Sequence, residues 1–221
     1  TLLRHLIGTE KPSSGSIKIF GHEITTMNAD AMRKLRGRYG MLFQSGALLQ
    51  SLTVAENVAL PLNEHTALDA GLIDTVVKMK LEQVGLTGHG HKKPSEISGG
   101  MKKRAALARA LALDPPLVFS DEPTAGLDPI MTAVVDELTQ RLTQKIGATV
   151  VVVTHDMNSV FRIGTRIIML GTGPNQGRII ASGTPAEIRA HPHPAVQQFI
   201  NGDPQGHNGD DAGEELYREA L

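Results

Sequence analysis

Short apolar runs alternate with stretches of helical periodicity along most of the chain. The runs are four or five residues long and rich in valine and isoleucine, which is typical of strands buried on both faces of a mainly parallel sheet. The pattern therefore predicts a layered α/β fold. The runs lie at residues 17–20, 40–44, 117–121, 149–153, 166–170 and 178–182.

The strand pattern is interrupted by a long stretch between Gln44 and Asp114. Segments in this stretch have the pattern of helices instead. We therefore predict a helical subdomain, inserted at about residues 45–114. Its helical segments are 55–62, 72–84 and 101–113.

The C-terminal part of the chain contains one clear helix start and then changes in composition. Thr184 can cap a short helix that begins with a proline, and Glu187 can complete a capping box. Beyond Gly202 the chain is rich in glycine and acidic residues. We expect a domain over residues 1–202, followed by an acidic flexible tail or partner-dependent arm over residues 203–221.

Composition narrows the classes of protein that remain. The chain has 221 residues, a net charge of -1 and no cysteine. The lack of a basic excess argues against broad nucleic-acid binding, and the lack of cysteine excludes disulfides, thiolate zinc sites and cysteine nucleophiles. The basic run at 33–38 is interpreted as a solvated helix face. Apolar runs such as 149–153 fall far short of the roughly 20 residues that cross a bilayer, so a membrane role would need partners.

One apolar strand ends in two adjacent carboxylates, Asp121 and Glu122. Ligands of open α/β sheets gather at the carboxyl ends of strands, so these acids indicate a site. In a phosphate-transfer enzyme, Asp121 would hold the magnesium shell and Glu122 would position or deprotonate the attacking water. The alternative is that the pair only solvates a turn.

A possible anion site precedes a long helical segment, where Ser98, Gly99 and Gly100 stand in sequence. Backbone N–H groups at a helix start are unpaired, the helix dipole is positive there, and the missing side chains let a phosphate come close. An ordinary capped helix start is the alternative.

Two further polar residues end apolar strands. The amide of Gln44 could ligate magnesium or orient water, and His155 could sense or polarise a terminal phosphate. Taken alone, residues at such positions are more often structural. The order of Gln44 and His155 along the chain, relative to the other candidate residues, is what favours a functional role for them.

Five segments, in this order, resemble those of ABC ATPases, and the resemblance covers residue 1 to about residue 200. It implies a P-loop NTPase fold with a RecA-like, mainly parallel sheet and an inserted helical subdomain. It also implies an ATPase that uses ATP and Mg²⁺. The segments are Gln44, ISGGM at 97–101, LVFSDEP at 117–123, AGLD at 125–128 and VTHD at 153–156, which match the Q-loop, signature, Walker B, D-loop and H-loop.

In that family, two ATPase domains hold two nucleotides head to tail. The resemblance therefore implies a homodimer in which Ser98, Gly99 and Gly100 cap the nucleotide bound by the partner. Leu127 and Asp128 would lie across the dimer seam. The other implied roles are Gln44 and Asp121 for Mg²⁺, Glu122 for the attacking water and His155 for the γ-phosphate.

Two departures from the family pattern affect what we expect. Met101 stands where a glutamine would complete a capping box with the signature serine, so the cap should be weaker. Thr1 matches the nucleotide-site threonine that follows the Walker A motif, G-x-x-x-x-G-K-[ST], whose glycines and lysine do not occur before it. We therefore expect an N-terminally truncated ATPase that, as the chain stands, binds ATP poorly and hydrolyses it negligibly.

Within the family, residues 41–66 and 94–115 most resemble the ATPase subunits of MCE/Mla-type lipid transporters. The resemblance implies coupling of ATP hydrolysis to transport of lipid, chiefly phospholipid, across the bacterial envelope. It further implies peripheral binding at the cytoplasmic face of the inner membrane. The implied partners are an integral-membrane permease that docks beside the segment after Gln44, an MCE-type lipid-binding protein and a small STAS-domain protein.

Three other functions remain open at this point. The chain could serve another ABC import or export system. It could be a soluble ABC ATPase that acts on DNA or ribosomes, although the insertions usual in such proteins do not occur in it. It could also be a non-catalytic scaffold, since the Walker A motif does not occur in these residues.

Overall fold

The computed structural model describes residues 1–171 and 177–202, which form two compact parts, 1–155 and 156–202. The tail predicted at 203–221 lies outside the described residues. Within the described residues, no helix is both long enough and apolar enough to cross a membrane.

A three-stranded parallel sheet forms the centre of the first part. Its strand order is β3-β4-β5, so β4 has a neighbour on each side. The apolar runs at 117–121 and 149–153 predicted β4 and β5 residue for residue. The strands are β3 (Tyr39–Leu42), β4 (Leu117–Asp121) and β5 (Thr149–Val153).

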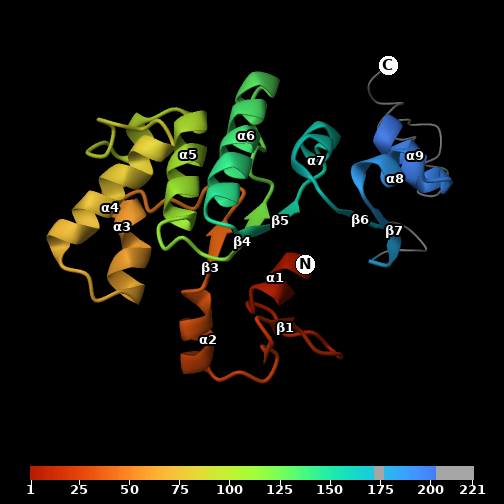
Figure 1. Ribbon diagram of the computed structural model, residues 1–221, viewed down its shortest axis with the longest axis horizontal. Coiled ribbons are helices and arrows are strands. Elements are labelled where there is room, and N and C mark those ends of the chain that lie inside the picture. Colours follow the sequence, from red (N-terminus) through yellow and green to blue (C-terminus); the bar gives the residue numbers. More distant parts are fainter. Residues whose placement is uncertain (172–176, 203–221) are drawn as a thin grey trace, which may run out of the picture. The chain divides into compact units, whose positions relative to one another are not determined.

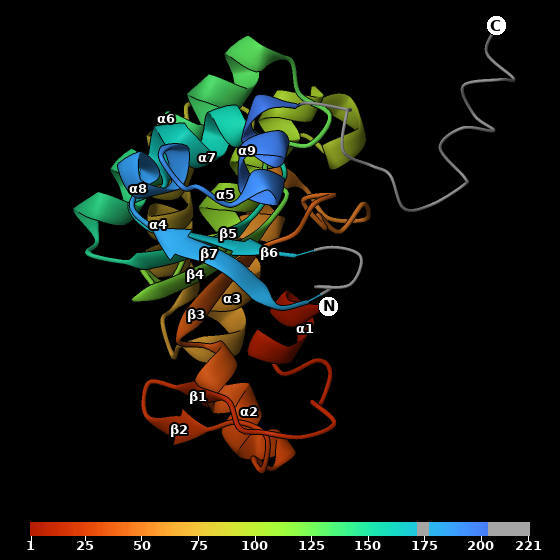
Figure 2. The ribbon, with the colours of Figure 1, turned by 90° about the vertical axis from the view of Figure 1, so that its right-hand side faces the viewer.

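Successive side chains of β4 point to opposite faces of this sheet, and a different layer covers each face. Val118 packs in the core cluster that includes α5 and α6, whereas Phe119 packs with α1, α2 and β1. Figures 1 and 2 show these two layers on opposite sides of the strands. The second layer consists of α1 (Leu2–Leu6), β1 (Lys18–Ile19), β2 (His22–Glu23) and α2 (Ala29–Arg36).

Helices fill the stretch between β3 and β4. Three of them, α3, α4 and α5, pack against one another around buried leucine, valine and alanine side chains. The sequence predicted helices here, and a separate subdomain at about 45–114 stays a prediction. The helices of this layer are α3 (Val54–His65), α4 (Ala70–Gln83), a short 3₁₀ helix (Pro94–Glu96), α5 (Gly99–Ala110) and α6 (Pro129–Lys145), the last following β4.

The second part differs from the sequence-based expectation in its strand pairing. The segments at 166–170 and 178–182 do form strands, β6 and β7, but the two pair antiparallel with each other. A short connection permits an antiparallel pair, whereas a parallel pair needs a crossover of a dozen or more residues. The run at 17–20 likewise forms an antiparallel pair, β1 with β2.

The helix predicted after Thr184 is confirmed. The Thr184 hydroxyl accepts from the backbone N–H of Glu187 at 3.3 Å, and the Glu187 carboxylate accepts from the backbone N–H of Thr184 at 2.7 Å. The elements of the second part are α7 (Met157–Ile163), β6 (Ile167–Leu170), β7 (Ile179–Gly183), α8 (Pro185–Arg189) and α9 (Pro194–Asn201).

Candidate nucleotide-binding site

The carboxyl ends of β3, β4 and β5 lie at one edge of the sheet because the three strands are parallel. Leu42 pairs with Ser120, and Asp121 pairs with Val153, so the three strands end at similar levels. The residues that follow are Gln44 after β3, Glu122 after β4 and His155 after β5. The structure thus gathers residues that are 33 to 111 positions apart in sequence at the edge where ligands of such sheets bind.

Glu122 and His155 are in direct contact. One carboxylate oxygen of Glu122 lies 2.7 Å from Nδ1 of His155 and accepts the backbone N–H of the same residue at 3.2 Å. The other oxygen accepts the hydroxyl of Thr154 at 3.2 Å. The Glu122 side chain is 19% exposed and that of His155 is 78% exposed, so the carboxylate is fixed while still reached by solvent.

The backbone of Glu122 adopts a conformation that side-chain-bearing residues rarely take. Its φ is +45°, in the left-handed region, and its N–H donates to the carbonyl of Val153 at 2.8 Å. For a residue other than glycine, this conformation costs on the order of 1–2 kcal/mol. Such strain occurs preferentially at functional sites, which supports a functional role for this glutamate.

Asp121 and Gln44 are the residues predicted to hold Mg²⁺. Asp121 is half-buried at the end of β4, and the side chain of Gln44 is exposed at the same edge of the sheet. Among residues 1–171 and 177–202, no three His, Cys, Asp or Glu side chains form a group that could hold a metal ion. A carboxylate and an amide suit Mg²⁺ that takes its other ligands from phosphates and water, since magnesium is usually bound in that way.

The signature segment begins α5. The Ser98 hydroxyl accepts from the backbone N–H of Met101 at 3.3 Å, without the reciprocal bond that Thr53–Glu56 and Thr184–Glu187 make. The cap thus has one of the two hydrogen bonds of a capping box, and its lower strength stays a prediction.

The two signature glycines lie in different surroundings. Ser98 and Gly99 are exposed, and a Cβ on Gly99 would meet only Leu127, at 4.0 Å. Gly100 is buried, and a Cβ there would lie 2.8 Å from the terminal methyl of Met131. Ser98 and Gly99 can thus face a phosphate, whereas Gly100 also serves the packing of α5 on α6.

Asp128 has a clear local role. Its carboxylate caps α6 by accepting the backbone N–H groups of Ile130 and Met131 at 3.0 and 2.9 Å. A place for Leu127 and Asp128 at a dimer seam stays a prediction. So does the role of Thr1, which is exposed and precedes α1.

Sequence reasoning missed the polar side chains that hold the segment after Gln44. Lys103 donates to the carbonyl of Gln44, and Arg109 donates to the carbonyls of Gly46 and Ala47 at 2.8 and 2.7 Å. One signal was available, because helical spacing places Lys103 on the same face of α5 as the buried residues Ala106, Leu107 and Ala110.

Asn57, which is fully buried on α3, was also missed. Its side chain accepts the N–H of Leu49 at 2.7 Å and donates to the carbonyls of Leu49, Leu52 and Thr53 at 3.1, 3.3 and 2.9 Å. Together, side chains from α3 and α5 satisfy backbone groups that have no strand or helix partner in this segment. The sequence signal for these contacts is weak, because a polar residue among apolar helix positions does not tell which backbone groups its side chain will meet.

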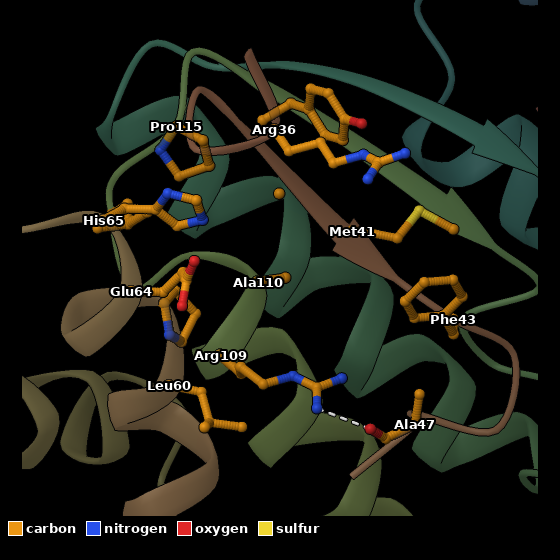
Figure 3. Close-up of a pocket in the computed structure, with 14 residues that line it drawn as sticks. Arg36, Met41, Phe43, Ala47, Leu60, Glu64, His65, Arg109, Ala110 and Pro115 are labelled. Atoms are coloured by element: carbon orange, nitrogen blue, oxygen red, sulfur yellow. Dashed lines mark hydrogen bonds between the residues drawn. The ribbon is translucent and has the colours of Figure 1, made fainter. Parts of the chain in front are cut away.

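A cavity of about 450 Å³ lies beside the same segment (Figure 3). Phe43 and Ala47, which flank Gln44, contribute to its wall, and Arg109 reaches across to the carbonyl of Ala47. The lining is mixed, with apolar and charged side chains from α2, β3, α3 and α5. Its other residues are Arg36, Tyr39, Gly40, Met41, Leu60, Pro61, Glu64, His65, Ala110, Leu113 and Pro115.

Comparisons with known proteins agree on the family. A profile described as "ABC transporter" matches residues 1–125. The chain is 45% identical to the intermembrane phospholipid transport system ATP-binding protein MlaF of Escherichia coli K12, over 91% of this chain and 74% of MlaF. It is 38% identical to the methionine import ATP-binding protein MetN 2 of Pseudomonas entomophila, over 95% of this chain and 62% of MetN 2.

A solved structure extends the similarity to the fold. The dimeric post-hydrolysis state of the ATP-binding cassette MJ0796, bound to ADP and Pi, matches with a TM-score of 0.73 and 32% identity, over 83% of this chain and 78% of that one. The match confirms the predicted α/β fold class, and the similarity to MlaF confirms the narrower resemblance to the Mla group. The chain belongs to the ABC transporter family, among its ATP-binding subunits, whose common activity is ATP hydrolysis.

Proposed function

We propose that this chain is the ATP-hydrolysing subunit of a transporter that moves phospholipids across the bacterial envelope. The observation that carries the enzymatic part is the contact of Glu122 with His155 at the carboxyl edge of the parallel sheet. The similarity to MlaF, which is named for intermembrane phospholipid transport, supports the choice of substrate.

Glu122 acts as the general base in this proposal. Its carboxylate accepts a proton from the water that attacks the γ-phosphate of ATP, and the bond to ADP breaks as the new P–O bond forms. His155 and Thr154 hold the carboxylate from two sides, so its direction is set before the nucleotide binds. His155, being largely exposed, can also reach a terminal phosphate.

Asp121 and Gln44 would hold Mg²⁺ together with the phosphates. When bound there, the ion neutralises charge on the phosphate oxygens. Asp121 stands one residue before the proposed base, so the strand end that carries Glu122 also sets the position of the metal-binding carboxylate.

The exposed start of α5 acts in a dimer. Ser98 and Gly99 present a helix N-terminus to the phosphates of a nucleotide bound mainly by the partner, with Gly100 directly behind them. The dimeric state of MJ0796 supports this arrangement, in which Leu127 and Asp128 lie at the seam and Thr1 belongs to the nucleotide site.

The 450 Å³ cavity receives a cytoplasmic helix of the permease. Its wall includes Phe43, which precedes Gln44, and Ala47, three residues after it, so an occupant would contact the segment that carries the proposed magnesium ligand. Apolar residues offer area for a helix to bury, and Arg36, Glu64 and Arg109 offer charges to orient it. An MCE-type lipid-binding protein, a STAS-domain protein and a position at the cytoplasmic face of the inner membrane complete the proposal.

The enzymatic part is tested with Glu122→Gln in the full gene product. Steady-state ATPase activity should fall by at least about 10²-fold, the contribution of a general base, while ATP binding persists. Glu137→Gln, which changes an exposed carboxylate of α6, should keep normal turnover. Near-normal turnover of Glu122→Gln would remove Glu122 from this role.

The transport part needs the permease. The subunit copurified with its permease in phospholipid vesicles should move labelled phospholipid only with ATP. If turnover is normal but no phospholipid moves, the chain serves another import or export system. The relationship to MetN 2, named for methionine import, makes labelled methionine a suitable second substrate.

A further inference from the structure

Lys103 is a charged residue on the buried face of α5. It is 7% exposed and lies one turn before Ala106 and Leu107, which are fully buried. Lysine is almost never buried to this extent unless its ammonium group has partners, because removing a charge from water is costly. Its position therefore needs a reason beyond packing.

The ammonium group of Lys103 joins two loops that carry proposed site residues. It donates to the backbone carbonyl of Gln44 and lies 3.5 Å from the backbone carbonyl of Glu122. Burial lowers the pKa of Lys103, and the negative charge of Glu122 acts in the opposite direction. Since both acceptors are main-chain carbonyls, these contacts hold the backbone at Gln44 and at Glu122 and do not depend on the conformation of either side chain.

Arg109 extends this attachment along the same helix. It lies six residues after Lys103, about 9 Å further along the axis. Its guanidinium binds the carbonyls of Gly46 and Ala47, whose φ values of +74° and +46° are both left-handed. The segment from Gln44 to Ala47 is thus tied to α5 at three carbonyls.

The start of α5 is the signature segment, one helical turn from Lys103. The helical turn fixes the backbone of Lys103 relative to the backbone N–H groups of Ser98 and Gly99, and the contact with Gln44 fixes the ammonium group at the other end of the side chain. A displacement of α5 would be passed to the backbones of Gln44 and Glu122 through one side chain.

We propose that Lys103 is a positioning residue, which aligns the backbones of Gln44 and Glu122 with the signature segment at the start of α5. This inference rests on the proposed function, because Lys103 acts through the proposed base Glu122 and the proposed magnesium ligand Gln44. The contacts of the Lys103 ammonium group are with the backbone carbonyls of Gln44 and Glu122. Hydrolysis then depends on the placement of α5 as well as on the carboxylate.

The test compares Lys103→Met, Lys103→Arg and Lys102→Met in the full gene product. Methionine matches the length and the apolar surroundings but cannot donate. Lys103→Met should lower kcat at least about tenfold and leave KM for ATP within about twofold, since alignment rather than binding is lost. Lys103→Arg should recover part of kcat, and Lys102→Met, on the more exposed face of the same helix, should match the wild type.

A double-mutant cycle distinguishes positioning from general support of the fold. In the Glu122→Gln background, Lys103→Met should lower the residual turnover by a smaller factor than it lowers that of the wild type, because the part of its effect that passes through the Glu122 carboxylate is already removed. An undiminished further loss, with KM and the melting temperature changing in parallel, would show a structural role and overturn the proposal. Wild-type kcat in folded Lys103→Met would also overturn it.

Failure of a variant to fold and failure of the proposed function can each be distinguished from failure of this inference. If Lys103→Met does not fold, Lys103→Gln replaces it, and wild-type kcat in that variant would overturn the proposal because the shorter amide cannot span both carbonyls. If Glu122→Gln keeps normal turnover, the proposed function fails independently of Lys103.

Discussion

The carboxylate of Glu122 lies 2.7 Å from Nδ1 of His155 and also accepts the backbone N–H of that residue. The two residues follow adjacent parallel strands, so the sheet itself brings them together. With Thr154 on the other oxygen, the carboxylate is directed by groups from the single loop after β5. The loop after β5 therefore orients the proposed base that the loop after β4 carries.

In the full gene product, replacing His155 with alanine should lower kcat for ATP by about 10²-fold, the effect of misplacing a catalytic group by roughly 1 Å. The Tm should change little because the side chain is 78% exposed. Steady-state ATPase assays check the first point and thermal unfolding checks the second. His22→Ala, at an exposed position of β2, is the matched control. Unchanged kcat in His155→Ala would mean that the contact does not orient Glu122.

Gly99→Ala should separate stability from activity. A Cβ there meets only Leu127 at 4.0 Å, and alanine favours a helix over glycine by up to about 1 kcal/mol, so the free energy of unfolding should be unchanged or higher. The added methyl group would obstruct a phosphate, and ATPase activity of the dimer should fall at least about tenfold, equivalent to about 1.4 kcal/mol.

Urea unfolding and ATPase assays on the same preparations test this expectation. Gly71→Ala, in the first turn of α4, makes the same change away from the signature and should keep full activity. Full activity of Gly99→Ala would argue that no phosphate approaches this point.

Some parts of this structure could be predicted accurately from the sequence and others could not, for physical reasons. Strands β4 and β5 were predicted residue for residue, because a parallel sheet covered on both faces needs continuous apolar runs. The place of Glu122 and His155 at one sheet edge followed from the same pattern. The antiparallel pairing of β6 with β7 did not, since an apolar run does not reveal which neighbour it will find.

The contacts that shape the segment after Gln44 were the least predictable. Lys103 and Arg109 meet it across 59 to 63 positions of sequence, and their partners are backbone carbonyls, which every residue has. The side-chain pattern of the segment after Gln44 therefore cannot predict these contacts. The sequence signal for these contacts lies on the helices instead, where Lys103 and Asn57 are polar residues on an otherwise apolar face.

Asn57→Leu should destabilise the chain by about 2–4 kcal/mol. The asparagine is fully buried and holds backbone groups of residues 49–53, and each buried group left without a partner costs roughly 1–3 kcal/mol. Urea unfolding measures the loss. Asn63→Leu, on the exposed side of the same helix, should stay within about 0.5 kcal/mol of the wild type. A small effect at Asn57 would show that water replaces its hydrogen bonds.

The N-terminus of α3 should contribute to acid sensitivity. Donation from the backbone N–H of Thr53, with its hydroxyl as the next cause, lowers the pKa of Glu56 below its ordinary value of 4.5. A carboxylate whose pKa is depressed by folding stabilises the fold fully above the unfolded value, and this stability is lost as pH falls through the folded pKa.

Glu56→Gln keeps an acceptor that does not titrate. The difference in unfolding free energy between wild type and Glu56→Gln should therefore shrink between pH 6 and pH 3, as urea titrations at both pH values would measure. A constant difference would mean that the carboxylate charge adds nothing to this cap.

Leu60→Glu should abolish copurification with the permease while the ATPase activity of the isolated subunit persists. Leu60 lines the cavity beside Gln44, and a buried carboxylate there would oppose an apolar partner helix by several kcal/mol. Leu72→Glu, on the exposed surface of α4 outside the cavity, is the matched control. Normal copurification of Leu60→Glu would place the permease elsewhere.

The left-handed backbone at Glu122 has a consequence for how this protein evolves. Glycine would occupy a φ of +45° without strain, and asparagine more easily than glutamate, so the fold alone would prefer either residue at this position. A lineage released from selection for hydrolysis would be expected to drift toward them and gain stability. A glutamate that is kept at this position is therefore evidence of selection for hydrolysis and not for stability.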